Sequence, residues 1–266
     1  MKLSVIILSY NTANVTLECL HSVQKYLPKK DTEIIVVDNA STDNTIPLLQ
    51  KENIKLIINQ TNLGFSKGNN IGAKMAVGEY LLFLNSDIRL LDNSLLSMLD
   101  YLRLHPQIGA IGPRMLNPNL TPQASVFPPQ TILNAFKEFW LDIPSYQKYL
   151  PPTNTPTSVF AISGGAFMLS KKLFEAFGGW NEKYFFYYED LDFCRFLHRQ
   201  NLEVVYYPSA QVVHHHGASV RKADSKSQKS WRRLIPGSIA YHGSLKHYII
   251  NCIIWSGQKF HRIFSK

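Results

Sequence analysis

A short acidic segment carries the residue types that most clearly suggest chemistry. Glu189, Asp190 and Asp192 place three carboxylates within four residues, directly after an aromatic run over residues 184–188. The helix dipole favours one acid in the first turn of a helix, but three acids beside an aromatic wall exceed that need. A carboxylate there can accept the proton of a hydroxyl group while aromatic rings stack on a sugar. We therefore predict a general base within this segment.

A second candidate carboxylate follows an apolar run over residues 80–84, where Asn85-Ser86-Asp87 comes next. A carboxylate at the end of a buried strand must be solvated or coordinated. Mg²⁺ or Mn²⁺ bound to a diphosphate takes one or two protein carboxylates, and phosphate and water oxygens complete its shell. We expect Asp87 to be such a ligand, and the alternative is an ordinary polar loop.

Three consecutive histidines, His214, His215 and His216, follow two valines near the end of a later strand. Alternation along an extended strand would place His214 and His216 on one side and His215 on the other. One neutral imidazole could complete the metal shell. A zinc site would need further ligands at a recognisable spacing, which the sequence lacks.

Polar residues also follow the first two apolar runs of the chain, with Ser9, Tyr10 and Asn11 after one and Asp38 after the other. Ligands of open parallel sheets bind beyond the carboxyl ends of the strands. An aromatic ring and a carboxylate suit a nucleobase, which offers a flat face and ring N–H donors. The alternative is that Asp38 and Ser41 only cap the next helix, and for Ser41 we expect that capping role.

A glycine-containing loop over residues 62–70 precedes a helix. The loop begins at Asn62. Gly64 and Gly68 allow a close backbone approach to a diphosphate, and Lys67 adds positive charge. The spacing matches neither a Walker loop nor a dinucleotide fingerprint, and the glycines could simply make a turn.

Short β-branched runs alternate with helix-length segments and would position these residues. We expect strands at 5–8, 34–37, 55–58, 80–84 and 108–111, with helices at 15–26, 44–52, 69–76 and 94–105. Buried runs separated by helices of about ten residues predict βαβ units, right-handed crossovers and an α/β fold with a mostly parallel sheet.

The alternation stops after Gly112. Nine prolines between residues 113 and 156 predict a long irregular excursion over the active-site face. Order should return with an apolar run at 160–170, helices from Lys171 and from about Glu189, and a strand at 204–207.

The charge of the 266-residue chain lies at one end. Residues 1–220 carry 18 basic and 18 acidic side chains, so the net charge of +9 belongs to the last 46 residues. Such a tail favours an anionic partner, either a membrane surface or nucleic acid. Apolar residues spaced along one helical face, with Tyr248 and Trp255, predict an interfacial amphipathic helix. A helix packed on the main domain is the alternative.

Three cysteines, Cys19, Cys194 and Cys252, form neither a disulfide framework nor a paired metal spacing, which favours a reducing compartment. The apolar start of the chain is too short for a signal peptide and lacks a small-residue cleavage site. No stretch approaches about 18 uninterrupted apolar residues, so we expect no transmembrane helix.

Taken together, these segments resemble the inverting family 2 glycosyltransferases of the GT-A fold. The rhamnosyltransferase-like branch of bacterial polysaccharide biosynthesis is the most similar. The resemblance extends over about residues 3–220, and its motifs are Val5-Ile6-Ile7-Leu8-Ser9-Tyr10-Asn11, Val36-Val37-Asp38-Asn39-Ala40-Ser41-Thr42-Asp43, Asn62-Leu63-Gly64-Phe65, Asn69-Asn70-Ile71-Gly72, Tyr80-Leu81-Leu82-Phe83-Leu84-Asn85-Ser86-Asp87, Gly164-Gly165-Ala166-Phe167, Gly178-Gly179-Trp180-Asn181-Glu182, Glu189-Asp190-Leu191-Asp192, and His214 with Gly217 and Ser219.

The resemblance implies a GT-A domain over residues 1–220 (a Rossmann-like, mostly parallel sheet flanked by helices), followed by a basic amphipathic helical tail at 221–266. Residues 1–112 would bind the nucleotide sugar and 113–220 the acceptor. Asp190 matches the catalytic base and Glu189 its neighbour. Asp87 matches the last acid of the family's DxD metal motif, whose first acid is Asn85 here, and His214 is a candidate metal or phosphate ligand. The donor site would comprise Ser9, Tyr10, Asn11, Asp38, Asn62, Gly64, Lys67, Asn85 and Ser86, and the acceptor site Gly164, Gly165, Trp180, Tyr188 and Asp192.

The resemblance also implies the reaction and its partners. The donor would be dTDP-rhamnose or a UDP-sugar with a divalent metal, Mg²⁺ or Mn²⁺, and the acceptor a glycan or lipid-linked glycan. The tail would dock the enzyme on the inner face of the plasma membrane, on its cytoplasmic side. Because the Gln-x-x-Arg-Trp motif of processive members is missing, we expect one or few sugars per encounter.

Three rival functions stay open on the sequence. An NAD-dependent oxidoreductase normally carries a GxGxxG after the first strand, and this chain does not. A nucleotidyltransferase shares the sheet and the metal chemistry, but it normally has a basic, glycine-rich loop after the first strand. A non-catalytic binding protein would not need the acidic cluster. The body also has no basic stripe interleaved with aromatics, so we expect no nucleic-acid partner.

Overall fold

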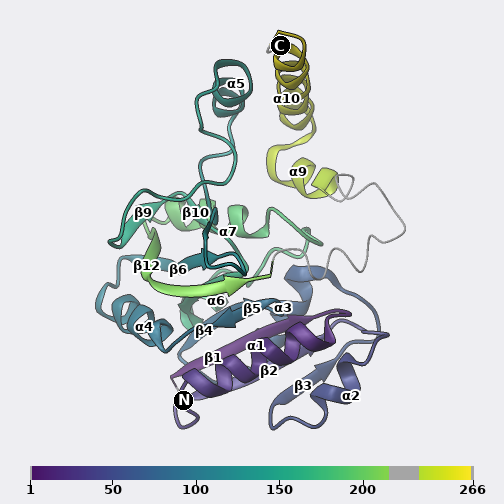
Figure 1. The fold of residues 1–266 in the computed structure, drawn as a ribbon, viewed down its shortest axis with the longest axis vertical. Coiled ribbons are helices and arrows are strands. Elements are labelled where there is room, and N and C mark those ends of the chain that lie inside the picture. Colours follow the sequence, from purple (N-terminus) through teal and green to yellow (C-terminus); the bar gives the residue numbers. More distant parts are fainter. Residues whose placement is uncertain (1, 216–233, 265–266) are drawn as a thin grey trace.

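The computed structural model describes residues 2–215 and 234–264, and its centre is a mixed sheet of ten strands (Figure 1). The strand order of its main path is β3-β2-β1-β4-β11-β6-β12-β5. The strands of this path are β1 (Leu3–Ser9), β2 (Thr32–Asp38), β3 (Lys55–Ile58), β4 (Tyr80–Asn85), β5 (Ile88–Leu90), β6 (Ile108–Leu116), β11 (Ala166–Ser170) and β12 (Glu203–His214).

The first four strands of the path are parallel, as the sequence predicts, because helices connect them. β11 enters antiparallel between β4 and β6, and β12 returns parallel to β6. The predicted α/β class with a mostly parallel sheet is confirmed. The central strands are apolar on both faces because helices cover both faces.

The core lies in two layers, one on each side of the sheet. In β1, Val5 and Ile7 pack with α1 (Ala13–Tyr26) and α4 (Ser94–Leu104), while Ile6 faces the opposite layer. That opposite layer includes α3 (Gly64–Met75) and α7 (Glu189–Arg199). The two remaining short helices of the body are α2 (Thr45–Leu49) and α6 (Lys171–Ala176).

Several boundaries differ from the sequence prediction. α3 begins at Gly64 rather than near residue 69, because the glycine-containing loop already winds into the helix. β12 continues to His214, since its second half pairs with both β5 and β6. The apolar run at 160–170 is divided between β10 (Ala161–Ile162) and β11.

The excursion after Gly112 is more ordered than predicted. It contains the short strands β7 (Pro122–Gln123) and β8 (Val126–Phe127), and it is followed by β9 (Thr157–Val159). It also contains helix α5 (Ile132–Leu141), which Thr131 caps by accepting a hydrogen bond from the Asn134 amide. The sequence did not predict this helix, because prolines flank it on both sides and indicate an irregular segment.

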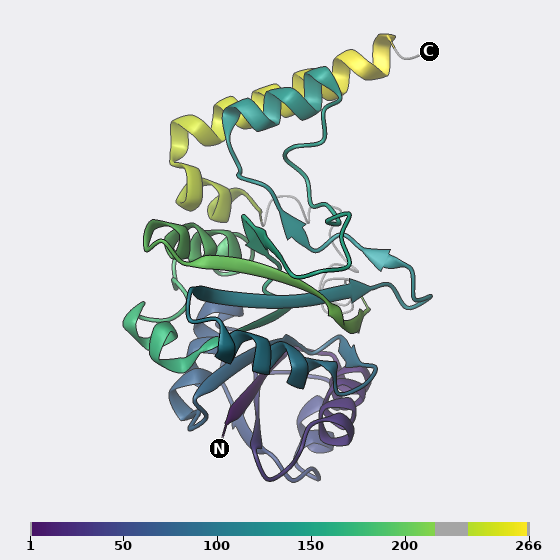
Figure 2. The same ribbon diagram turned by 90° about the vertical axis from the view of Figure 1, so that its left-hand side faces the viewer.

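The C-terminal part forms α9 (Leu234–His242) and α10 (Ser244–Phe264), and α10 lies alongside α5 at a distance from the sheet (Figures 1 and 2). The two helices approach closely at Gly257, where an added Cβ would lie 2.1 Å from the Phe139 carbonyl oxygen. The predicted helical extension is therefore present, and one of its faces packs on a helix of the body. His216 and residues 221–233 lie outside the described residues. Among those described, no helix is long and apolar enough to cross a membrane.

Candidate active site

The carboxyl ends of β1, β2 and β4 bring the predicted donor residues to one edge of the sheet. Ser9 lies opposite Asp38 in the β1–β2 register, and Leu8 lies opposite Asn85 in the β1–β4 register. The Ser9 hydroxyl bonds Thr12, and Thr12 in turn bonds the Ser86 hydroxyl at 3.1 Å. Hydroxyl groups thus tie the end of β4 to the loop after β1.

Asn11 joins the loop after β1 to the loop after β2. It has the left-handed backbone conformation (φ 54°), and its side-chain oxygen accepts hydrogen bonds from the amides of Thr42 and Asp43 at 2.7 and 3.3 Å. The backbone amide of Asn11 donates to the Ser41 hydroxyl. Tyr10, the neighbouring residue, stays partly exposed at this edge.

Asp38 is fully buried and holds the turn that follows β2. The Ser41 amide and hydroxyl donate to its two carboxylate oxygens at 2.7 and 2.6 Å. Burial raises the pKa of Asp38, and the two bonds from Ser41 oppose that rise. Neither residue caps the next helix, because α2 begins at Thr45 with Asn44 at its N-cap position and no side-chain capping bond, so the expected capping role of Ser41 is wrong. A contact between Asp38 and a nucleobase stays a prediction.

Gly64 connects the donor loop to the aromatic run. Its φ is +79°, and an added Cβ would lie 2.4 Å from the Phe185 carbonyl oxygen, which accepts a hydrogen bond from the Phe65 amide. Packing alone therefore requires glycine here. Asn62 accepts the Gly64 amide, whereas Lys67 is exposed on α3. Whether these residues touch a diphosphate stays a prediction.

Asp87 and His214 form a buried pair, with 3.3 Å between Oδ1 and Nε2. The Nδ1 atom of His214 faces Gln123 Oε1 at 2.7 Å, and the Gln123 amide nitrogen donates to Asn117. Because the Gln123 side-chain oxygen can only accept a hydrogen bond, Nδ1 of His214 carries the proton in this arrangement, and Nε2 faces Asp87. His215 instead approaches Glu18 on α1, as strand alternation predicts.

A carboxylate oxygen and an imidazole nitrogen that face each other fit a divalent cation as two of its ligands. Within residues 2–215 and 234–264, no group of three or more His, Cys, Asp or Glu side chains is arranged to hold a metal ion. Among the described residues, Asp87 and His214 would thus supply two ligands, and diphosphate and water oxygens can supply others.

The predicted base lies at the first turn of α7, where Glu189 and Asp190 are both buried. Asp190 accepts hydrogen bonds from the amides of Gly164 and Leu191 at 3.0 and 2.8 Å, and each oxygen retains a second lone pair. Burial raises the pKa of both carboxyls. Glu189 Oε2 is buried with no hydrogen-bond partner among the described residues. Raised pKa values and an unpartnered oxygen are typical of a site completed by substrate.

The dipeptide Gly164-Gly165 joins the base to the donor edge. The Gly164 amide bonds Asp190, and the Gly165 carbonyl accepts the amide of Asn85 at 2.9 Å. A Cβ on Gly164 would meet the Phe65 ring at 3.3 Å. The two halves of the predicted site are therefore neighbours, although more than a hundred residues separate Asn85 from Asp190.

The remaining predicted acceptor residues have different surroundings. Trp180 is only 1% exposed and packs on Phe83 and Phe167, so it belongs to the core and offers no face to a ligand in this structure. Asp192 is paired with Arg195. Tyr188, whose backbone is left-handed at φ 73°, packs its ring against Tyr241 of α9.

Lys148, which comes from the irregular excursion, is not among the residues predicted from the sequence. Its amine lies 4.6 Å from the Phe127 ring centre. Part of its surface is exposed, yet loss of hydration lowers its pKa, while the charges of Asp190 and Glu189 raise it. Conversely, Lys148 holds the pKa of both carboxyls down against burial. No periodicity or motif marks this lysine in the sequence.

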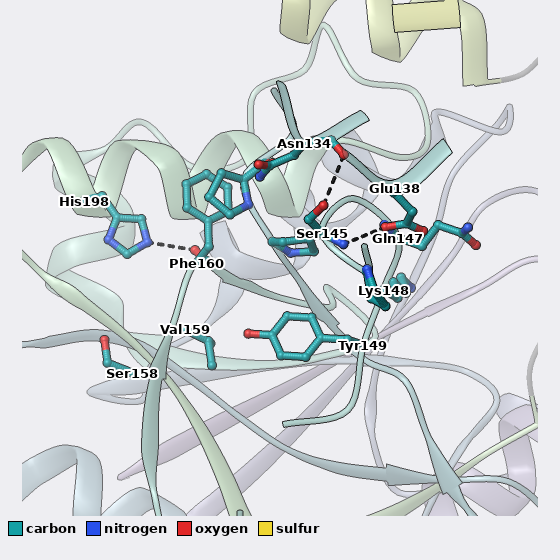
Figure 3. Close-up of a pocket in the computed structure, with 13 residues that line it drawn as sticks. Asn134, Glu138, Ser145, Gln147, Lys148, Tyr149, Ser158, Val159, Phe160 and His198 are labelled. Atoms are coloured by element: carbon teal, nitrogen blue, oxygen red, sulfur yellow. Dashed lines mark hydrogen bonds between the residues drawn. The ribbon is translucent and has the colours of Figure 1, made fainter. Parts of the chain in front are cut away.

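Lys148 also lines a pocket of about 580 Å³ between the excursion and α7 (Figure 3). Glu138 on one wall accepts the amides of Ser145 and Gln147, and these bonds outweigh burial and lower its pKa. The lining consists of Pro128, Pro129, Asn134, Glu138, Pro144, Ser145, Gln147, Lys148, Tyr149, Ser158, Val159, Phe160 and His198.

The model of the family described as "Glycosyl transferase family 2" matches residues 4–178 of the chain, which include the whole donor edge. This chain belongs to glycosyl transferase family 2. The predicted family is thereby confirmed, and the protein is a glycosyltransferase.

Two curated relatives of this family 2 glycosyltransferase are a rhamnosyltransferase and an O-antigen biosynthesis protein. It is 28% identical over 213 residues to the N-acetylglucosaminyl-diphospho-decaprenol L-rhamnosyltransferase of Mycobacterium tuberculosis (strain CDC 1551 / Oshkosh), covering 70% of this chain and 67% of that protein. It is 31% identical over 207 residues to the O-antigen biosynthesis protein RfbC of Myxococcus xanthus, covering 73% of this chain but only 16% of that protein.

Solved structures confirm the GT-A architecture of this family 2 glycosyltransferase. The structure of GalNAc-T7 with UDP, GalNAc and Mn²⁺ superimposes with a TM-score of 0.66 at 18% identity, covering 80% of this chain and 43% of that one. The mannosyltransferase PcManGT from Pyrobaculum calidifontis, in complex with GDP-Man and Mn²⁺, gives a TM-score of 0.62 at 14% identity, covering 99% and 75%.

Proposed function

We propose that the enzyme transfers one sugar from a nucleoside-diphosphate sugar to a hydroxyl of a glycan or lipid-linked glycan, with inversion at the anomeric carbon. The observation that carries the proposal is the Gly164-Gly165 bridge, which holds Asp190 beside the strand end that bears Asn85. A base and a nucleotide edge joined by backbone hydrogen bonds suit a single displacement between two bound substrates. Residues 1–112 provide the donor half and 113–220 the acceptor half.

Asp190 is the base of the reaction. Its free lone pair accepts the proton of the acceptor hydroxyl as that oxygen attacks the anomeric carbon from the face opposite the diphosphate. The pKa that burial has raised makes the carboxylate a stronger base than a solvated aspartate. Glu189 lies beside it, where its unpartnered oxygen can accept a second acceptor hydroxyl.

The leaving diphosphate departs at the donor edge, near Ser86, Asp87 and His214. Asp87 and His214 would hold the divalent cation, which when bound offsets the negative charge that develops on the diphosphate. The structure of GalNAc-T7 contains Mn²⁺ together with UDP, which supports this assignment. Tyr10, Asn11 and Asp38 would surround the nucleoside.

The acceptor side consists of the pocket in Figure 3 together with the aromatic run. Lys148 supports this choice because it lines the pocket and its charge acts on Asp190. The name of the Mycobacterium tuberculosis relative favours a rhamnose donor, here dTDP-rhamnose, and a lipid-linked glycan as acceptor. The UDP in the GalNAc-T7 structure supports a UDP-sugar as the alternative donor. A lipid-linked acceptor would place the enzyme at the inner face of the plasma membrane, attached through the basic segment 221–266 to anionic lipid.

The test is thermal stability of the protein with a panel of nucleoside diphosphates, each with and without Mn²⁺. Binding stabilises by about 2.7 kcal/mol at a hundred times the dissociation constant. The proposal expects one pyrimidine diphosphate to stabilise the protein strongly, and only with metal present. Stabilisation by dinucleotides or triphosphates alone would contradict it.

A further inference from the structure

Exposed apolar side chains concentrate on one part of the molecule. This part is the arm formed by α5, residues 142–143 and α10, whose two helices lie side by side away from the sheet (Figure 2). Of the 18 large hydrophobic side chains exposed in the described part of the chain, ten lie on this arm. They are Leu133, Phe136, Leu141, Ile143, Leu245, Tyr248, Ile249, Trp255, Phe260 and Ile263. Such a concentration marks an interaction surface, because single exposed apolar residues scatter over ordinary surfaces.

On α10, the exposed residues share one face. Leu245, Ile249 and Ile263 recur at helical spacing on the side opposite Ile250 and Gly257, which face α5 and the body. The helix is therefore apolar on both sides. One side is used for packing within the molecule, and the other has no covering element in the described structure.

The exposed face of α10 continues onto α5 through a row of rings. Trp140 stacks on Phe260 at 5.3 Å and on Phe136 at 6.2 Å, and both phenylalanines are partly exposed. Leu133, one turn before Phe136, is 60% exposed. The two helices thus present one continuous surface, not two separate stripes.

The charge of the surface favours an anionic partner. Lys246 and Arg262 flank the exposed face of α10, and Lys259 lies within it, with its amine 5.0 Å from the Trp255 ring centre. α10 contains no acidic residue, and the exposed Asp142 of the arm faces His261 of α10 at 3.6 Å. A two-fold contact between copies of the chain would set these cations against each other. Aromatic rings with basic neighbours suit the headgroup region of an anionic bilayer, where each basic residue strengthens binding about fivefold.

We propose that the α5–α10 arm docks as one surface on an anionic lipid bilayer. The proposal rests on the proposed function and deepens it, because α5 belongs to the acceptor half and not to the basic tail. Asn134 and Glu138 of α5 line the acceptor pocket. Docking through α5 therefore holds the wall of that pocket at the level of the lipid headgroups, where a lipid-linked sugar presents its hydroxyls.

The experiment measures sedimentation of the full chain with vesicles of phosphatidylcholine and phosphatidylglycerol in equal parts. Leu133→Glu on α5 and Trp255→Glu on α10, which is 64% exposed, each place a charge on the proposed surface. The control is Leu104→Glu on α4, because Leu104 is 77% exposed but lies outside the arm. We expect each arm variant to bind at least tenfold more weakly and the control to bind like the parent.

Parent-like binding by Leu133→Glu would overturn the composite surface, and absence of parent binding would overturn docking altogether. A parent dimer in analytical ultracentrifugation that both arm variants dissociate would assign the surface to a second copy of the chain. Stabilisation by nucleoside diphosphate is measured on the same variants. Loss of vesicle binding with intact nucleotide binding separates a result on the arm from a failure of the proposed function.

Discussion

The donor edge and the base region differ in how far their polar side chains are hydrogen-bonded within the protein. At the donor edge, Asp38 is bonded twice by Ser41, and the side-chain oxygen of Asn11 accepts two loop amides. At the base, Glu189 and Asp190 are buried together, and one Glu189 oxygen has no hydrogen-bond partner in the described structure.

The difference shows which half of the site is complete before substrate arrives. Local hydrogen bonds fix the shape of the donor edge, so a nucleotide bound as proposed would meet a preorganised surface. In the base region, Oε2 of Glu189 lacks a hydrogen-bond donor among the described residues, and Lys148 acts on the two carboxylates only through its charge. A substrate hydroxyl would supply that donor at the position where the reaction needs it.

The largest expected effect comes from Asp190→Asn. The amide cannot take the acceptor proton, so turnover should fall by about 10²–10⁴-fold while donor affinity stays nearly unchanged. Initial rates of transfer and nucleotide-binding isotherms measure the two quantities. Asp100→Asn, at an exposed position of α4, is the matched control and should leave both unchanged. Equal losses of binding and turnover would remove Asp190 from the role of base.

Gly64→Ala tests the joint between the two regions. The left-handed backbone costs an alanine about 1–2 kcal/mol, and overlap with Phe185 should bring the loss of unfolding free energy to about 2–4 kcal/mol. Gly178→Ala has the same φ range but open space around its Cβ, and it should lose only the backbone part. Urea unfolding measures both variants, and equal losses would show that Phe185 does not press on this loop.

Asp38→Asn tests the donor edge itself. If the carboxylate accepts a nucleobase N–H, the dissociation constant for the nucleoside diphosphate should rise by about 10–100-fold, since a charge-assisted bond is lost. Ser41→Ala removes the hydroxyl that donates to Asp38 and accepts from the Asn11 backbone amide, but it keeps the carboxylate, so it should weaken binding less. Calorimetric titration distinguishes them. Similar losses in both variants would assign Asp38 to holding the turn alone.

Lys148→Met should give the smallest effect, visible in the pH profile. The base works when ionised, so activity is lost as pH falls through its pKa. Because the Lys148 charge lowers the pKa of Asp190 and Glu189, its removal should move the acidic limb of kcat/KM to higher pH. Lys172→Met on α6 serves as control. An acidic limb that stays in place would show that Lys148 does not act on the base.

The donor half could be predicted largely from the sequence. Apolar runs buried on both faces fix the strands, and the residue after each strand must lie at the ligand edge, as Ser9, Asp38 and Asn85 do. Each of these predictions depends only on residues close together in the sequence, so hydrophobic periodicity and the position of a residue at a strand end are enough to make it.

The acceptor half could not be predicted in the same way because its contacts are long-range. The effect of the Lys148 charge on the pKa of Asp190 and the bond of Gln123 to His214 depend on how the excursion folds back, which no repeat encodes. Trp180 shows the opposite failure. Its motif resembles a ligand contact, but the surrounding phenylalanines bury it.

The most direct measurement of the central claim is the anomeric configuration of the sugar released when the donor reacts slowly with water, followed by proton NMR. With Asp190 as base and no covalent intermediate, the first sugar formed should have the configuration opposite to the donor, and Asp190→Asn should form almost none while still binding nucleotide. A product of retained configuration, or equal rates for the two proteins, would contradict a single displacement at this site.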